Sequence, residues 1–369
     1  MLKLRKKLAQ YQEQFYLVFI LSMVGLISAG FNSEDKFYLV VFFVATLFLL
    51  LKMAVTDFTW REILWMAVIT LLLGINLLRN GEKTLIMTVI GVFGAKNISL
   101  EKVFRQSLWL KIVLTVGTIL CASVGIIENE ALLLPKNSEH ILIYCYGYIH
   151  PNATFANIFL IFVIAILVWK DKLKWYAYAG FSLVLLAVYS VLICRTGLLV
   201  WGALLIIVLG YKISCKLKWE RIYLTLLLLI PVTMAMLTFL LPLIGMRNDA
   251  FLSTVDYYLT GRIHHLIQFW SPLGSLPLGN APREPFDSSY FYLVYNYGWV
   301  MALVCFFAYL YTMWNCIRKN RPYEVIILST MALYGFMEHW PLSVGWNLSL
   351  LYLSHILFKN RVPDANMPN

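Results

Sequence analysis

Long apolar runs recur along the whole chain and constrain its fold more than any other feature. Hydrophobic residues make up 61% of the 369 residues and charged residues only 13%, whereas charged residues make up roughly 25% of an average soluble domain. A membrane-spanning helix needs about 20 predominantly apolar residues. The sequence therefore predicts an all-α, polytopic integral membrane protein with one transmembrane domain over residues 1–369.

The apolar runs predict about twelve transmembrane helices, within a range of 11 to 13. The first run follows the basic stretch KLRKK and lacks an A-x-A-like cleavage site, so it is expected to be retained as a helix. The predicted helices cover residues 15–30, 37–55, 61–78, 84–95, 107–127, 152–169, 174–193, 197–211, 222–244, 289–313, 323–339 and 342–358.

The charge pattern predicts the orientation of these helices. With the N-terminus in the cytoplasm, alternate connections hold most of the Lys and Arg residues, as the positive-inside rule requires. The cytoplasmic segment around the start of the helix at 107–127, for example, is assigned Lys96, Lys102, Arg105 and Lys111. Both termini are therefore expected on the cytoplasmic side of the cell membrane. The net charge of +11 is explained by this distribution, and no nucleic acid partner is expected.

Two of the predicted outer connections are long, at about 128–151 and 245–288, and long connections are usually functional. In the second half of the chain every predicted external cation is an arginine: Arg195, Arg247, Arg262 and Arg283. A guanidinium never deprotonates and donates several hydrogen bonds to phosphate. These arginines indicate a site for a phosphate or pyrophosphate headgroup, although each one could instead contact lipid phosphates or a nearby acid.

The stretch YLTGRIHHLIQFW lies in the second long connection and has helical spacing. One side carries Leu259, Arg262, Ile263, Leu266, Ile267 and Trp270. This pattern predicts an amphipathic helix at the outer surface, with Arg262 on its buried side. His264 and His265 are neighbours and point about 100° apart, so they are not expected to face one site.

Other polar residues lie near the predicted outer ends of helices. Asp287 precedes a helix, where it could cap the helix or accept a proton from a sugar hydroxyl. Glu338 and His339 either bind substrate or satisfy local partners. His150 and Asn152 either start a helix next to Pro151 or contact a donor substrate.

Aromatic residues such as Tyr290 are abundant near these ends. They fit an interfacial belt or a surface that stacks on sugars. The six cysteines have no C-x-x-C spacing, so neither a metal site nor a disulfide framework is expected, and no cofactor is expected.

The order of these motifs resembles the bacterial O-antigen and capsule polymerase and ligase superfamily, in particular the Wzy-type polymerases. The resemblance covers roughly residues 145–345. It consists of HPN at 150–152, Ser190 with RTG at 195–197, TGR at 260–262, PLG at 277–279, DSSY at 287–290 and YG at 297–298.

The resemblance implies a GT-C-like membrane glycosyltransferase that polymerises polyprenyl-pyrophosphate-linked oligosaccharide repeat units at the outer face. It implies one lipid-linked donor and one lipid-linked acceptor, with a flippase and a chain-length regulator as partners. Arg195 and Arg262 match the arginines expected to hold the donor pyrophosphate, with Arg247 or Arg283 assisting. Ligases of the superfamily carry a histidine near Asp287, so the aspartate favours a polymerase and leaves the base as Asp287 or a histidine.

Two alternatives stay open. A glycan ligase would bind the same donor and differ only in its acceptor. A flippase or transporter of lipid-linked oligosaccharides would also suit twelve helices, but such proteins usually carry ionisable groups near the membrane midplane. The predicted helix centres are almost free of charged residues. No D-x-D motif is present, which is consistent with metal-independent glycosyl transfer.

Overall fold

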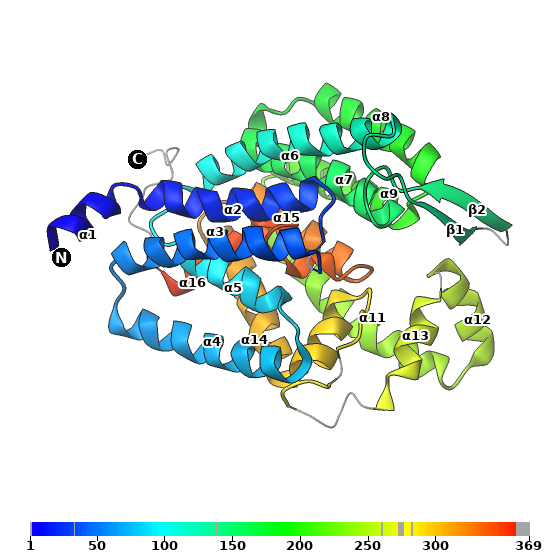
Figure 1. The fold of residues 1–369 in the computed structure, drawn as a ribbon. Coiled ribbons are helices and arrows are strands. Elements are labelled where there is room, and N and C mark those ends of the chain that lie inside the picture. Colours follow the sequence, from blue (N-terminus) through cyan, green and yellow to red (C-terminus); the bar gives the residue numbers. More distant parts are fainter. Residues whose placement is uncertain are drawn as a thin grey trace.

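The computed structural model describes residues 2–32, 34–136, 139–259, 261–271, 277–281 and 283–358. The structure is a bundle of helices with one small hairpin (Figure 1). Thr260 of the TGR motif and residues 359–369 lie outside the described residues. The first half contains α1 (Leu2–Ala9), α2 (Gln12–Ser28), α3 (Lys36–Val55), α4 (Trp60–Asn80), α5 (Thr84–Gly94), α6 (Leu100–Ser123), β1 (Ala131–Lys136), β2 (Glu139–Tyr144), α7 (Pro151–Trp169) and η1 (Lys170–Lys172).

The second half contains the helices that carry most of the predicted site residues. They are α8 (Trp175–Leu192), α9 (Arg195–Lys216), α10 (Glu220–Leu226), α11 (Leu229–Gly245), α12 (Asp249–Tyr258), α13 (Arg262–Gln268), α14 (Ser289–Arg318), α15 (Pro322–Gly335), η3 (Trp340–Leu342), η4 (Leu348–Leu353) and α16 (Ser354–Leu357).

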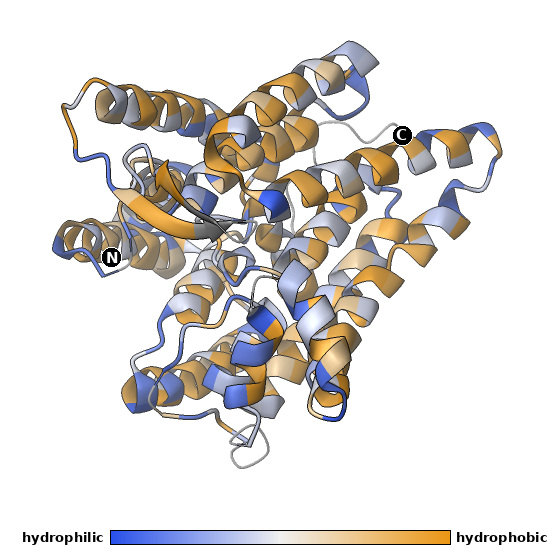
Figure 2. Cartoon of the chain, turned by 90° about the vertical axis from the view of Figure 1, so that its right-hand side faces the viewer, coloured by the Kyte–Doolittle hydropathy of each residue, from blue (hydrophilic) through white to orange (hydrophobic). Residues whose placement is uncertain are grey.

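Among the described residues, 8 helices are long and apolar enough to cross a membrane. They are α3, α4, α6, α7 with η1, α8, α9, α10 joined to α11, and α14. Figure 2 shows that hydrophobic residues cover most of these helices, with hydrophilic residues mainly at helix ends and connections. The prediction of a polytopic, mainly α-helical membrane protein is therefore confirmed at this level.

Three other predicted spans form helices shorter than the roughly 20 residues that a membrane-spanning helix needs. Helices α2, α5 and α15 have 17, 11 and 14 residues. The prediction of one helix over 342–358 is wrong, because 3-10 turns and a short helix occupy this segment. The Asn347 side chain accepts from the Ser349 amide and hydroxyl and donates to the Pro341 carbonyl. These local bonds compete with a continuous helix.

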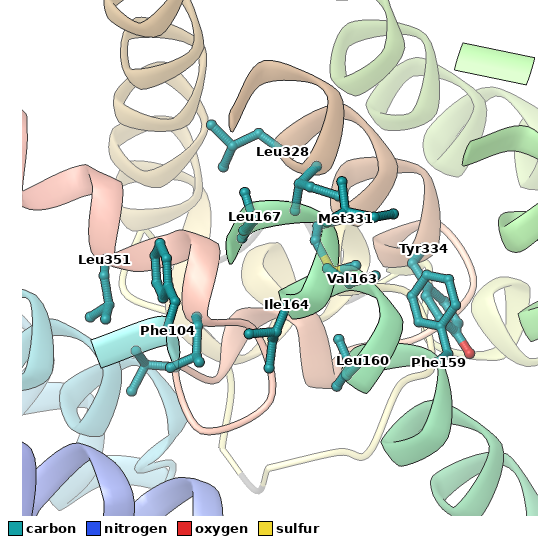
Figure 3. Close-up of a cluster of buried hydrophobic side chains, with 14 of the residues drawn as sticks. Phe104, Phe159, Leu160, Val163, Ile164, Leu167, Leu328, Met331, Tyr334 and Leu351 are labelled. Atoms are coloured by element: carbon teal, nitrogen blue, oxygen red, sulfur yellow. The ribbon is translucent and has the colours of Figure 1, made fainter. Parts of the chain in front are cut away.

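The bundle core lies around α7. Figure 3 shows apolar side chains of α7 packed against α15, α6 and η4. The labelled residues are Phe104, Phe159, Leu160, Val163, Ile164, Leu167, Leu328, Met331, Tyr334 and Leu351, and every one of them is buried. Helix α7 is buried over much of its length because it lies in the middle of the bundle, which explains its nearly continuous apolar sequence.

Two features of the connections differ from the predictions. The connection at 128–151 contains an antiparallel hairpin, β1–β2, in which Leu133 pairs with Leu142. Helix α6 begins at Leu100 rather than residue 107, so Lys111 lies midway along the helix. Its assignment to the cytoplasmic connection is therefore wrong. Lys111 is fully buried. It is therefore an exception to the expectation that the helix centres are almost free of charged residues.

The two ends of the bundle carry separate polar clusters. Arg5 pairs with Asp57 at 2.6 Å, and the ring of Phe358 lies 5.7 Å from that of Phe58. Both described ends of the chain therefore meet at the turn between α3 and α4. Helices α12 and α13 and the hairpin lie at the opposite end of the bundle (Figure 1), which we call the α13 end.

Candidate functional site

Arg262 is placed by a turn rather than by the long amphipathic helix that the sequence predicts. Gly261 has φ of +80° and separates α12 from α13. The Asp256 carboxylate then accepts hydrogen bonds from the amides of Ile263 and His264. Leu259 therefore belongs to the turn after α12, and the predicted helix over 259–270 is broken at Gly261. Because Ile263 is buried, the start of α13 is held against the bundle.

Arg262 lies between two carboxylates that come from distant parts of the chain. Its Nε donates to Asp287 Oδ2 at 2.8 Å, and its Nη2 lies 3.4 Å from Glu338 Oε1. The Arg262 side chain is 18% exposed and that of Asp287 is 51% exposed. The prediction that Arg262 lies on a buried face is confirmed. Asp287 does not cap α14, because the N-cap residue is Ser288.

Glu338 extends this cluster to α7. Its Oε1 accepts a hydrogen bond from Asn152 Nδ2 at 3.1 Å. The Glu338 main-chain carbonyl accepts from Ser289 Oγ at 2.7 Å, which fixes the segment after α15 to the start of α14. Burial raises the pKa of Glu338 to about 8, although Arg262 and Asn152 act in the opposite direction. We call Arg262, Asp287, Glu338 and Asn152 the Arg262 cluster.

Three of the predicted histidines, His265, His264 and His150, have different surroundings. His265 lines a small pocket of about 30 Å³ together with Arg262 and Asp287. His264 is exposed, so the two neighbouring histidines diverge as their spacing predicts. His150 is the N-cap of α7, where its Nδ1 accepts from the Asn152 amide at 3.1 Å. The helix-start interpretation of His150 is confirmed.

His339 connects the Arg262 cluster to a second polar cluster. Its ring stacks on Tyr292 at a centroid distance of 4.9 Å and an angle of 9°. Its Nδ1 is buried and has no hydrogen-bond partner in the described part of the chain. Burial lowers the pKa of His339, while the nearby carboxylates of Asp287 and Glu82 oppose that effect.

The second cluster holds Arg283. Arg283 pairs with Glu34 at 3.0 Å and with the buried carboxylate of Glu82 at 3.5 Å. Glu82 also accepts hydrogen bonds from the Tyr292 hydroxyl and, at 3.2 Å, from the Tyr297 hydroxyl. Burial acts to raise the pKa of Glu82, but the bonds from Tyr292 and Thr84 and the charge of Arg283 lower it overall. Sequence reasoning missed Glu82, although it is a lone acid in a short predicted outer connection.

The remaining predicted residues are Arg195 on α9, Arg247 after α11 and Tyr290 on α14. Arg195 begins α9, and a Cβ on nearby Gly197 would lie 2.2 Å from Phe155 of α7, so this end of α9 abuts α7. Arg247 is exposed in the turn after α11 and has no ion-pair partner among the residues that the structure describes. The Tyr290 hydroxyl donates to the Ala332 carbonyl at 3.0 Å.

A large apolar cavity begins next to the Arg262 cluster. It has a volume of about 460 Å³, within the usual range of ligand pockets. Its lining includes Ser289, Tyr290 and Gly335, which neighbour the Arg262 cluster in the chain, and Ile356 and Leu357 of α16. Helices α5, α11, α14 and α15 supply most of the wall, and nearly all of their lining side chains are apolar. The cavity can therefore hold a hydrocarbon chain whose polar end reaches the Arg262 cluster.

In the described ranges, no group of three or more His, Cys, Asp or Glu side chains could hold a metal ion. The chemistry that the Arg262 cluster offers is that of a fixed cation next to one accessible and one buried carboxyl group. No protein-family model, curated protein or solved structure matches this chain.

Proposed function

We propose that this protein is a membrane glycosyltransferase that polymerises polyprenyl-pyrophosphate-linked oligosaccharide repeat units at the outer face of the cell membrane. The observation that carries the proposal is the Arg262 cluster beside a large apolar cavity: Ser289 lines the cavity and donates a hydrogen bond to the main-chain carbonyl of Glu338. Such a site suits a substrate with an anionic headgroup and a long hydrocarbon tail. The proposed architecture is GT-C-like with twelve crossings, which counts α2, α5, α15 and the 348–357 segment as short spans.

Arg262 holds the pyrophosphate in this proposal. A phosphate oxygen that binds Arg262 competes with Asp287, because Asp287 is the more exposed of its two carboxylate partners. Binding of the donor thus frees the Asp287 carboxylate at the place where the acceptor hydroxyl arrives. Arg262 stays fixed by α13 and stabilises the negative charge that develops on the leaving pyrophosphate.

The reaction is a displacement at the anomeric carbon. The bond from that carbon to the pyrophosphate oxygen breaks, and a bond to the acceptor hydroxyl oxygen forms. The hydroxyl proton passes to the Asp287 carboxylate, or to His265 in the same pocket. The products are an extended lipid-linked glycan and free polyprenyl pyrophosphate. Arg195, at the nearby start of α9, is a further candidate for the pyrophosphate.

The experiment is a gel of glycan chain length from cells that lack this gene, complemented at matched membrane levels. Wild type is expected to restore a ladder, and Arg262→Ala or Asp287→Ala to leave mainly single repeat units. Removal of one fixed transition-state donor lowers rates by about 100-fold or more. Arg318→Ala is the control, because Arg318 is exposed at the other end of α14.

A wild-type ladder from a folded Arg262→Ala protein would overturn the proposal. Two other outcomes would replace it with the alternative functions. Repeat units that accumulate on the cytoplasmic leaflet would identify a flippase. The buried Lys111 favours this class, because transporters usually carry ionisable groups inside the membrane. Polymer that stays on its lipid carrier and never reaches a final acceptor would identify a ligase.

A further inference from the structure

Lys111 is a buried cation that the proposed chemistry does not use. It lies midway along α6 and its side chain is fully buried. Its Nζ donates to Asn157 Oδ1 at 2.5 Å and to Ser28 Oγ at 3.3 Å, and it lies 5.6 Å from the ring centre of Trp346. No carboxylate in the described part of the chain forms an ion pair with it.

A lysine without a counter-ion in a membrane bundle is costly, and such residues usually have a function. Lys111 is not a packing requirement, because an apolar side chain of similar length would fill the same space without the cost of burying an amine. Its hydrogen bonds are therefore the feature to explain. They join α6 to α2 and α7, and the cation–π contact with Trp346 adds the segment that contains this ring.

Two of the three partners of Lys111, Asn157 and Trp346, lie close in the chain to Asn152 and Glu338, which form one contact of the Arg262 cluster. Asn157 lies on α7, whose first turn carries Asn152. Trp346 follows Glu338 in the chain, and its ring lies 5.4 Å from that of Trp340. Lys111 thus links α7 to the 340–346 segment, and the Asn152–Glu338 hydrogen bond joins α7 to the residues just before that segment.

We infer that Lys111 is a positioning residue for the Asn152–Glu338 pair: it ties α7 to the 340–346 segment and so sets the geometry of the Glu338 carboxyl in the Arg262 cluster. This inference rests on the proposed function only where it predicts a change in the pH profile of kcat. The geometric consequence is independent of any substrate. Without the tie, the Asn152 hydrogen bond to Glu338 weakens, and that bond lowers the pKa of Glu338. Loss of Lys111 therefore favours the protonated carboxyl.

The test measures protonation of Glu338 directly. Dicyclohexylcarbodiimide reacts with protonated carboxyl groups in apolar surroundings, and peptide mass spectrometry can quantify labelling of Glu338 in the full-length protein in vesicles between pH 6 and 10. Wild type is expected to lose labelling as the pH rises through about 8. Lys111→Met is expected to raise the midpoint by about half a pH unit or more, in the same direction as Asn152→Leu.

The control is Lys52→Met. Lys52 is also fully buried, but its Nζ donates to the Lys96 carbonyl at the opposite end of the bundle. Lys52→Met is expected to leave the midpoint unchanged. The inference is overturned if Lys111→Met keeps the wild-type midpoint, or if Lys52→Met shifts it equally, since a shared shift would reflect general loosening.

The kinetic readout separates this inference from the proposed function. In a polymerisation assay, Lys111→Met should move the pH profile of kcat by the same shift as the labelling midpoint and leave KM nearly unchanged. A shifted midpoint in a protein that does not polymerise supports the inference and removes the proposed function. An unshifted midpoint in a protein that polymerises supports the proposed function and overturns the inference.

Discussion

Arg262 lies between two carboxyl groups with different surroundings, and this difference divides their chemical roles. Asp287 is about half exposed, whereas the Glu338 side chain is 11% exposed. An accessible carboxylate can exchange its arginine partner for a phosphate and then meet an incoming hydroxyl. A buried carboxyl whose pKa is raised to about 8 by burial stays mostly protonated at neutral pH, so it limits the negative charge around Arg262.

Glu338 should make stability depend on pH. Its folded-state pKa is raised from 4.5 to about 8, so its contribution to stability is greatest below pH 4.5 and is lost as the pH rises through 8. Between pH 7 and 9 the expected loss is about 1 kcal/mol, or about 2 °C in Tm. His339, whose pKa is lowered by burial, is already neutral in this range. Thermal unfolding in detergent measures the effect.

Glu338→Gln is the matched variant for that measurement. Glutamine keeps the size of the side chain and removes the titration, so the decline in Tm between pH 7 and 9 should become smaller. An equal decline in wild type and Glu338→Gln would show that other groups cause it.

At the scale of single elements, α14 is the helix on which the site most depends. It contains a break at Gly298, where φ is 81° and ψ is 165°. The carbonyls of Tyr295, Asn296 and Tyr297 accept from the Asn280 amide and from the side chains of Asn80 and Asn76. These bonds replace the helical ones that the break removes. The PLG and YG motifs meet here, and they fix the loop that leads to Asp287.

Gly298→Ala should therefore destabilise the protein. A Cβ on Gly298 would lie 2.1 Å from the Pro277 carbonyl oxygen, and positive φ adds strain for any L-residue. The expected loss is more than about 2 kcal/mol, measured as a lower Tm and lower yield of folded protein. Gly202→Ala on α9 is the control, because a Cβ added to Gly202 would have no other atom within 4 Å. Equal Tm values for both variants would refute the packed-break interpretation.

Apolar runs predict most of the elements, because length and hydropathy decide whether a segment forms a buried or membrane-spanning helix. The predicted helix over 152–169 corresponds to α7 at Pro151–Trp169. Length and hydropathy do not predict local hydrogen bonds of polar side chains. The bond from Asn347 to the Pro341 carbonyl, for example, interrupts the last predicted helix. The hairpin is not predicted either, because apolar residues lie on both faces of its strands and the sequence shows no alternation of apolar and polar residues. Leu133 is exposed whereas Ile143 is buried, although both are apolar.

The candidate site was predictable as a set of residues but not as an arrangement. Arginine chemistry singles out Arg262, and the start of a helix singles out Asp287. Their contact with each other spans 25 positions, and the contact of Arg262 with Glu338 spans 76. Such pairing depends on how helices pack. The same reason explains why Arg283, a predicted assistant, lies with Glu34 and Glu82 instead.

At the scale of the whole molecule, the polar clusters lie at two ends of an apolar bundle. The proposed orientation places the α13 end outside the cell and the turn between α3 and α4 inside. A cysteine introduced at Tyr258, which is 71% exposed, or at Asp57, whose side chain is 92% exposed, tests this orientation after the exposed Cys215 and the half-buried Cys121 and Cys305 are replaced by Ser. An impermeant maleimide should label Tyr258→Cys in intact cells and Asp57→Cys only after permeabilisation. The opposite pattern would invert the orientation.

The apolar cavity makes a separate prediction about substrate length. Ala302 and Ala332 line it, and a phenylalanine at either position would occupy space that the proposed polyprenyl chain needs. Ala302→Phe or Ala332→Phe should raise KM for a long-chain donor by about tenfold, which corresponds to about 1.4 kcal/mol. KM for a short-chain analogue should change little. Ala203→Phe on α9, outside the cavity wall, is the control, and equal effects on both donors would argue against a chain in this cavity.

The most direct measurement of the central claim uses the purified protein and its proposed substrate. The protein is reconstituted in vesicles with the lipid-linked repeat unit that accumulates in cells lacking the gene, and products are separated by chain length. We predict a ladder with one polyprenyl pyrophosphate released for each new glycosidic bond. Arg262→Lys, which keeps the charge but loses the planar fork, should slow it by about 100-fold. Folded wild-type protein that leaves the repeat unit unextended would contradict the account.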